Sequence, residues 1–182
     1  MASCQGRIRN LSRFLRTGWF CLALLLPVIG LSILAGDVKA GAEYARMETV
    51  TVVTARGSFE YAAEIADTPQ LRRRGLMFRQ RLPKDKAMLF DWGGRQLVAN
   101  MWMRNTYIPL DMVFIASDGT VVRVAENTEP RSLKIISSGV PVAAVLEIAA
   151  GTARRIGLEP GSKVRHMIFS RQSRDLQPKK IR

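Results

Sequence analysis

The sequence predicts a mostly β protein, at the margin of the α+β class. The expected architecture is an antiparallel β-sandwich or small barrel of about eight short strands with one or two short helices. Two observations lead to this prediction. Short runs that are β-branched, or that alternate between apolar and polar residues, recur between turn signals along the chain. These runs do not alternate with long helical patterns, which argues against a doubly wound βαβ fold.

The first elements predicted are the two strands of a β-hairpin. Residues 48–56 (ETVTVVTAR) are rich in β-branched residues, and residues 59–66 alternate between apolar and polar side chains. Gly57-Ser58 lies between the two runs and supplies the turn.

A short helix follows the hairpin. Asp67 or Thr68 can accept hydrogen bonds from the first free amides, and Pro69 suits the first helical turn. Gly75 is a typical C-terminal stop, so the helix is short. Residues 79–86 then form a polar loop.

The rest of the chain contains further short strands. Asp118-Gly119 predicts a tight hairpin turn, and residues 127–139 are predicted to cross the fold without regular structure. Thr152–Ile156 is predicted as one helical turn between Gly151 and Gly157. The predicted strands are residues 87–92, 96–103, 110–116, 120–126, 141–149 and 162–170.

The first 40 residues have the layout of a cleavable secretory leader. Four arginines within the first 16 residues precede an apolar run over residues 19–35, and a stretch of small residues ends at Ala40. We therefore expect an exported protein, periplasmic or extracellular after cleavage, without a stable membrane span. The alternative is an N-terminal membrane anchor, because residues 18–36 reach the lower end of a bilayer-spanning length.

The organisation expected after the leader is simple. A linker at residues 41–47 leads into a single β-rich domain at residues 48–170. A basic tail at residues 171–182 is expected to be disordered.

Charge and cysteine content change when the leader is removed. Of 28 Lys and Arg and 15 Asp and Glu, five basic residues and one acid lie in residues 1–40, so 23 and 14 remain, a formal net charge of +9. For an exported chain this charge favours anionic envelope polymers over nucleic acid, and the alternative is that it only aids solubility. Cys4 and Cys21 both lie in the leader, so the mature chain has no disulfide, thiolate metal site or cysteine nucleophile.

Several phrases in the middle of the chain occur together in one known family. They are Arg74-Gly75-Leu76-Met77, Met88-Leu89-Phe90, residues 102–106 (WMRNT), residues 108–111 (IPLD), Phe114 and Val145-Leu146-Glu147, followed by Gly151 and Gly161. In this order they resemble the family called "domain of unknown function 192", over roughly residues 48–168. The resemblance implies a compact, mostly β domain of sandwich or barrel type. It implies little about activity, because the activity of that family is unassigned.

One group of polar and aromatic side chains forms the candidate ligand site. Arg104 and Asn105 lie in a loop between two apolar strands and can face a ligand, with Trp102 as a stacking platform. In a structural alternative, Asn105 and Thr106 satisfy the loop backbone. Asp111 would then hold the loop through Arg104 or main-chain amides. The ligand-binding candidates are Trp102, Arg104, Asn105, Thr106, Asp111 and Arg74.

Three consecutive arginines, Arg72 to Arg74, occupy the predicted short helix. At most two of them share one face of a helix, and we expect one of them, Arg74, to turn inward. The others form either a patch for anionic headgroups or glycans, or a solvated face.

Two acidic residues, Asp111 and Glu147, lie in apolar strands, where an unpaired charge is costly. Across a cleft they would act as general acid and base of a hydrolase or lyase. Alternatively, each pairs with Arg74 or Arg104 and stabilises the fold.

Methionines suggest a third hypothesis. Met101 and Met103 lie two residues apart on one predicted strand face, and thioethers outside the cytoplasm suit Cu(I), with His166 as an additional nitrogen ligand. The alternative is that these methionines fill the core. We expect no metal and no cofactor.

The leading functional hypothesis is a non-catalytic binding or scaffolding domain of the cell envelope. Its expected partner is an anionic envelope polymer or glycan. The alternatives are an envelope-glycan hydrolase or lyase that uses Asp111 and Glu147, and methionine-based copper binding. The sequence does not fix the oligomeric state.

Overall fold

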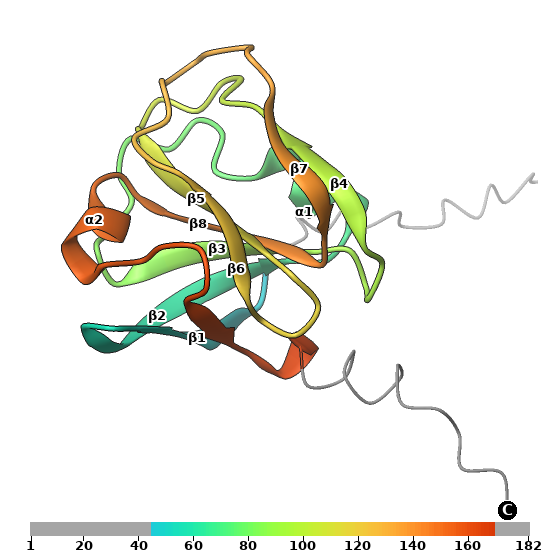
Figure 1. Cartoon of the computed structure of the whole chain (residues 1–182). Coiled ribbons are helices and arrows are strands. Elements are labelled where there is room, and N and C mark those ends of the chain that lie inside the picture. Colours follow the sequence, from blue (N-terminus) through green and yellow to red (C-terminus); the bar gives the residue numbers. More distant parts are fainter. Residues whose placement is uncertain (1–44, 170–182) are drawn as a thin grey trace, which may run out of the picture. The chain divides into compact units, whose positions relative to one another are not determined.

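The computed structural model describes residues 45–169, which form nine strands, two short helices and a final helical turn at residues 167–169 (Figure 1). The predicted leader, most of the predicted linker and the basic tail lie outside the described residues. The strands are β1 (Met47–Thr54), β2 (Gly57–Ala66), β3 (Lys86–Asp91), β4 (Leu97–Met101), β5 (Leu110–Ile115), β6 (Val121–Ala125), β7 (Ile136–Val142), β8 (Ala144–Ala149) and β9 (Lys163–Arg165). The helices are α1 (Pro69–Arg74) and α2 (Thr152–Ile156).

Seven of these strands form one strongly curved sheet in the order β6-β5-β8-β3-β2-β1-β9. All neighbours are antiparallel except β2 and β3, which are parallel because α1 and the loop after it carry the chain back between them. The sheet nearly closes into a barrel, because Thr120, just before β6, bridges to Lys163 of β9. The Val164 amide also donates to the Gly119 carbonyl at 2.8 Å. This mostly β architecture confirms the predicted fold class.

The interior of the barrel is an apolar core. The side chains that alternate inward along the strands are fully buried there, as the period of two of a β-strand requires. The cluster includes Val52 of β1, Ile65 of β2, Leu89 of β3, Val113 of β5 and Leu146 of β8.

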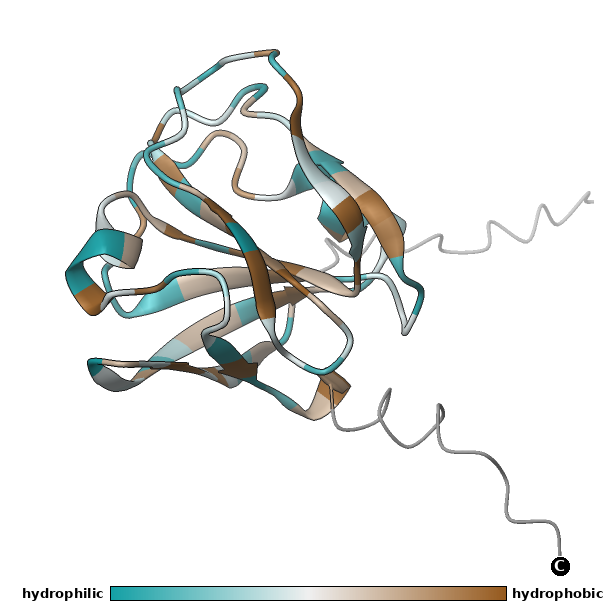
Figure 2. Ribbon diagram, in the orientation of Figure 1, coloured by the Kyte–Doolittle hydropathy of each residue, from teal (hydrophilic) through white to brown (hydrophobic). Residues whose placement is uncertain are grey.

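A second layer covers the outer face of β5, β8 and β3. It consists of α1 and a two-stranded ribbon of β4 and β7, which is separate from the barrel sheet (Figure 1). Hydrophobic residues are visible on β4 as well as on the barrel strands (Figure 2). Between the layers lies a second buried cluster that includes Phe90, Ala99, Met112 and Val145. The outer face of the barrel is therefore itself a packed interface.

The predicted helix signals are confirmed at α1. The Thr68 hydroxyl accepts a hydrogen bond from the Leu71 amide at 3.2 Å, and Pro69 occupies the first turn. Gly75 ends the helix with a φ of 48°. The Arg72 guanidinium donates to the carbonyls of Asp67 and Asp91, at 2.5 and 2.7 Å, and so ties α1 to β3.

Two predicted boundaries are wrong in the second half of the chain. The segment predicted as irregular, residues 127–139, contains the start of β7. The single strand predicted at residues 141–149 is two strands, since the backbone bends at Ala143 and passes from the outer ribbon into the barrel. The apolar run continues through the bend because Val142 packs in the second core and Ala144 in the barrel core.

Two smaller differences concern the hairpin and the end of the chain. The turn at Asp118-Gly119 joins β5 to β6 as predicted. The last strand is shorter than predicted, because β9 ends at Arg165 and a helical turn follows. Among residues 45–169, no helix is long and apolar enough to cross a membrane.

Candidate functional site

A cavity of about 390 Å³ lies between the two layers of the fold. Its walls are α1 with the loop that follows it, the end of β3, and β4 with the residues after it. Glu147 of β8 also lines it, so the cavity reaches the outer face of the barrel. Charged, aromatic and thioether groups therefore meet in one small space.

Glu147 is the acidic residue of this cavity. In the sheet it lies between Met88 of β3 and Met112 of β5, which are its direct neighbours across the two strand pairs. Only 4% of Glu147 is exposed, and its carboxyl makes no hydrogen bond or ion pair with any residue in the range 45–169. Burial raises the pKa of this carboxyl to about 8. At neutral pH the group is therefore mostly protonated.

Three arginines of α1 line the same cavity, and they differ in whether the side chain has a hydrogen-bond partner. Arg72 is half-buried and held by the two carbonyl groups described above. Arg73 and Arg74 are exposed, and neither side chain makes a hydrogen bond or ion pair within the described part of the chain. These two guanidinium groups are thus available to an anionic ligand.

Aromatic side chains complete the walls. Trp102 follows β4 and is 46% exposed, which is unusual for so large an apolar surface. The Arg104 guanidinium lies 5.9 Å from the Trp102 ring centroid. Phe90 and Trp92 line the cavity from the end of β3. A ligand in this cavity would meet flat apolar surfaces as well as charge.

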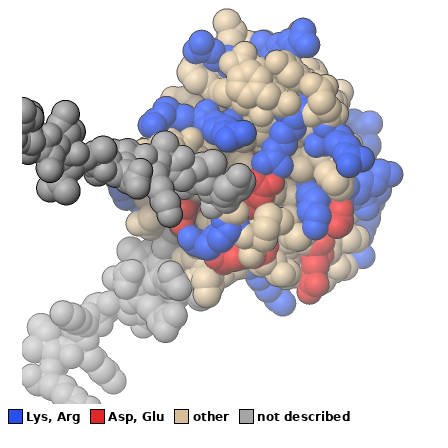
Figure 3. Space-filling view, turned by 180° about the vertical axis from the view of Figure 1, so that it is seen from behind, with Lys and Arg blue, Asp and Glu red and all other residues tan. Residues whose placement is uncertain are grey.

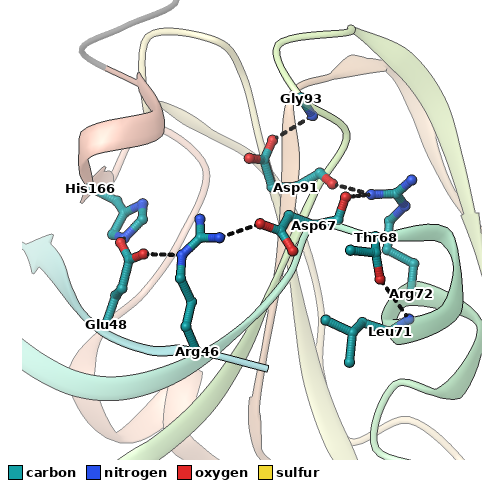
Figure 4. Close-up of polar contacts among 9 residues, drawn as sticks. All are labelled: Arg46, Glu48, Asp67, Thr68, Leu71, Arg72, Asp91, Gly93 and His166. Atoms are coloured by element: carbon teal, nitrogen blue, oxygen red, sulfur yellow. Dashed lines mark hydrogen bonds and ion pairs between the residues drawn. The ribbon is translucent and has the colours of Figure 1, made fainter. Parts of the chain in front are cut away.

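A polar network fixes the helix that carries the arginines (Figure 4). Arg46, just before β1, pairs with Asp67 at the end of β2 and with Glu48 of β1. Glu48 in turn contacts the His166 Nε2 atom at 2.8 Å. Burial lowers the pKa of His166, although Glu48 acts in the opposite direction.

The same region of β3 contributes to this network. The Asp91 carboxylate accepts a hydrogen bond from the Gly93 amide at 2.8 Å. The backbone carbonyl of Asp91 holds Arg72. The position of α1 relative to the sheet is therefore set by contacts near its N-terminal side and by Arg72. The side chains of Arg73 and Arg74 take no part in these contacts.

The structure brings several predicted site residues together. Arg74, Trp102, Thr106 and Glu147 all line the cavity, and Arg104 lies beside Trp102. Arg74 is exposed, whereas Arg72 is the arginine that turns toward the sheet, so the expectation for Arg74 was wrong in this respect.

Asn105 has a structural role. Its φ of 56° places it in the left-handed region, which Asn tolerates better than most residues. Its carbonyl accepts a hydrogen bond from the Phe78 amide at 2.8 Å. Of the structural alternative, the Thr106 hydroxyl does donate to the Arg104 carbonyl at 3.4 Å. The Asn105 side chain instead contacts the Met77 sulfur at 4.0 Å, and Asp111 accepts from amides outside this loop.

The predicted carboxylate pair does not form. Asp111 is fully buried, and its two oxygens accept hydrogen bonds from the amides of Asn127 and Ala153, each at 2.8 Å. Asp111 pairs in register with Ile148, which faces the barrel interior, so Asp111 and Glu147 lie on opposite faces of the sheet. They cannot act on one substrate as acid and base. Neither carboxylate pairs with Arg74 or Arg104 among residues 45–169.

The predicted copper ligands have other roles in the structure. Met101 lines the cavity, whereas the Met103 sulfur is fully buried and accepts a hydrogen bond from the Thr128 hydroxyl at 3.2 Å. His166 is paired with Glu48 of β1. The core-filling role expected as the alternative fits both methionines better.

Sequence reasoning missed part of the site. Asn100 and Trp92 were not singled out, although both line the cavity. Arg73 was named only within the run Arg72 to Arg74, as part of a patch or a solvated face, and its place beside the cavity depends on how α1 packs. Trp92 carried a partial signal, as a large aromatic residue at the end of an apolar strand. Asn100 carried none, because its position depends on how β4 packs.

Comparisons with known proteins agree with this fold. A proposed transcription regulator from Sinorhizobium meliloti 1021 is 44% identical, with a TM-score of 0.67 over 70% of this chain and 99% of that chain. A protein of unknown function from Novosphingobium aromaticivorans DSM 12444 is 38% identical, with a TM-score of 0.64 over 66% of this chain and 85% of that chain.

No curated protein matches this chain. A family model, DUF192, described as "Uncharacterized ACR, COG1430", matches residues 51–166, which include every strand from β2 to β9 and the whole cavity. The chain therefore belongs to the DUF192 family.

Proposed function

We propose that this protein is an exported binding domain whose cavity, between α1, β4 and β8, takes an acidic group of a cell-envelope polymer or glycan. The single observation that carries the proposal is the pair Arg73 and Arg74. Both line a cavity of about 390 Å³, and neither has a partner among residues 45–169. Two free guanidinium groups beside an exposed tryptophan form a site suited to an anionic group on a flat ring.

The overall charge supports the same proposal. Lys and Arg side chains are spread over the face seen from behind, and acidic side chains adjoin only some of them (Figure 3). This field would attract an anionic polymer before specific contact. The leader-like composition of residues 1–40 supports export, which is where such polymers occur.

A binding experiment tests the site directly. The exported form, purified from an expressing cell, is titrated with polygalacturonate as the anionic glycan, with dextran as the neutral glycan, and with duplex DNA. The double variant Arg73→Ala/Arg74→Ala is compared with Arg81→Ala/Arg95→Ala, which removes the same charge from exposed positions outside the cavity.

The expected result is binding to polygalacturonate that falls about tenfold or more in the cavity variant and much less in the control. Equal losses in the two variants would mean diffuse charge attraction and no cavity site. Tighter binding to DNA than to polygalacturonate would favour the role by which the Sinorhizobium meliloti relative is described.

A further inference from the structure

The cavity has two chemically different ends. Glu147 is the only acidic residue among those that line it, and its carboxyl lies on the barrel face between two buried methionines. Arg73 and Arg74 lie at the exposed side. Among residues 45–169, Glu147 forms no ion pair with an arginine. The acidic group and the two guanidinium groups therefore do not satisfy each other.

Glu147 requires a partner that the described residues do not provide. A buried polar group without a hydrogen bond is rare in folded proteins, and each case needs an explanation. The unpartnered carboxyl lines a cavity large enough for a ligand, so a ligand group can supply the missing donor. An ammonium group is a strong donor to a carboxylate, because the hydrogen bond is charge-assisted.

The remaining walls also favour a cation near Glu147. Phe90, Trp92 and Trp102 line the cavity, and the faces of aromatic rings attract cations. Met77 and Met101 add polarisable thioether surface without a competing charge. The inner part of the cavity therefore has the composition of an ammonium-binding site.

We propose that the cavity binds a zwitterion, in which an ammonium group pairs with Glu147 and a carboxylate or phosphate group of the same ligand pairs with Arg73 and Arg74. This inference rests on the anionic-group site proposed above and adds the second, cationic group. Amino acids, peptide ends and amino-substituted phosphates belong to this class. A cavity of about 390 Å³ has the volume of roughly 13 water molecules, so it holds one such residue or polymer end.

Binding is linked to release of a proton. Glu147 is protonated at pH 7 in the empty cavity, and an ammonium partner stabilises its ionised form. The other charged side chains that line the cavity are Arg72, Arg73 and Arg74, of which Arg72 is held by carbonyl groups. Binding of a zwitterion at pH 7 therefore releases close to one proton, whereas binding of a simple anion at the arginines releases none.

The test uses ligand pairs that differ only in the amine. The exported form is titrated by calorimetry with ω-amino acids from glycine to 6-aminohexanoate, and with the matching carboxylic acids. Phosphoethanolamine and ethyl phosphate form a further pair. Each titration is repeated at pH 7 in two buffers of different ionisation enthalpy, which gives the number of protons released.

The expected result is a preference of about tenfold or more for at least one amino ligand over its partner, with close to one proton released. Glu147→Gln removes this preference and the proton release, and retains binding of the acids. Glu129→Gln, an exposed acid outside the cavity, changes neither.

Other outcomes separate the two proposals. If each amino ligand and its matching acid bind equally well, or if binding releases no proton, the zwitterion proposal is wrong while the anionic site stands. If neither member of any pair binds, the zwitterion proposal is also wrong. If Arg73→Ala/Arg74→Ala leaves the binding of the acids unchanged, the anionic site itself is wrong.

Discussion

Asp111 and Glu147 lie on adjacent strands and differ by a single step in register, and this step determines their roles. Asp111 faces the barrel interior, where two backbone amides satisfy it, one of them at the start of α2. Gly151 at the N-cap of α2 has no side chain to do this, so Asp111 serves as the cap. Glu147 faces the cavity without a partner among residues 45–169.

A first prediction concerns Asp111. In Asp111→Asn, one carboxylate oxygen becomes an amide NH₂ group, which faces an N–H donor and leaves it unsatisfied. We expect the free energy of unfolding to fall by about 1–3 kcal/mol. Urea denaturation of the variant, with Glu129→Gln as an exposed control, measures this loss. An unchanged midpoint would show that the hydrogen bonds from Asp111 to Asn127 and to the start of α2 do not stabilise the fold as described.

Glu147 predicts an unusual dependence of stability on pH. Its pKa is about 8 in the folded protein and near 4.5 when unfolded, so between these values the folded state binds the extra proton. The free energy of unfolding therefore falls as pH rises from about 5 to 8, by up to about 1.4 kcal/mol per pH unit from this group. Urea denaturation from pH 5 to 9 tests this.

Glu147→Gln removes the titrating group while keeping its size. The variant is expected to lack this slope, so that the difference in stability between variant and wild type grows in favour of the variant up to pH 8. Parallel pH profiles for the two proteins would mean that Glu147 is ionised in the folded protein, or has a partner at neutral pH.

The sequence alone allowed part of the site to be predicted at the scale of residues. Glu147 could be identified because an acidic residue within an apolar strand is informative in itself. Arg74 was identified from the arginine run of the predicted helix, and Trp102 and Thr106 from the polar and aromatic loop between two strands. The face on which each side chain lies could not be assigned. Asp111 and Glu147 both occupy apolar runs, and only the register of β5 against β8 separates them.

At the scale of elements, local signals predicted the elements whose ends have specific turn chemistry. The helix α1 has Thr68, Pro69 and Gly75 at its ends, and the β5–β6 hairpin has Asp118-Gly119. The boundary between β7 and β8 has no such signal. The run from Val140 to Leu146 is apolar throughout because it passes from one core to the other. Pro141 is tolerated because the β4–β7 ribbon lies apart from the barrel sheet.

The closure of the barrel depends on a close approach at Gly119. Its φ is 80°, and a Cβ atom there would lie 2.4 Å from the Val164 carbonyl oxygen of β9. Gly139 has a similar φ of 75° with nothing within 4 Å of such an atom. A residue with a Cβ atom would therefore pay the cost of a left-handed backbone at either position, but only at Gly119 would it also clash with β9.

A matched pair of variants tests this closure. Gly139→Ala is expected to cost about 1–2 kcal/mol, the penalty of the backbone conformation. Gly119→Ala is expected to cost about 1–3 kcal/mol more, because β9 must move away from the turn before β6. Chemical denaturation gives both values, and similar losses in the two variants would show that β9 does not close the barrel tightly.

At the scale of the whole molecule, the fold separates stability from binding. The barrel core and the cap at Asp111 hold the domain together, while the cavity lies in the second layer, where the side chains of Arg73 and Arg74 have no partner among residues 45–169. Substitutions at Arg73 and Arg74 should therefore alter binding with little effect on folding. Such a division suits a domain whose activity is recognition, as proposed above.

The proposed export of the molecule has a chemical signature in its cysteines. Cys4 and Cys21 are the only two cysteines of the chain, and both precede Ala40. Cleavage after Ala40 would yield a protein that begins at Gly41 and contains no thiol. We expect the form recovered from outside the cytoplasm to give Gly41 in N-terminal sequencing and no reaction with a thiol reagent after denaturation and reduction.

Two reactive thiols and an N-terminus near Met1 in a membrane fraction would instead identify residues 18–36 as a retained anchor. The cavity would then act at a membrane surface, where its acidic ligand must lie within reach of the linker.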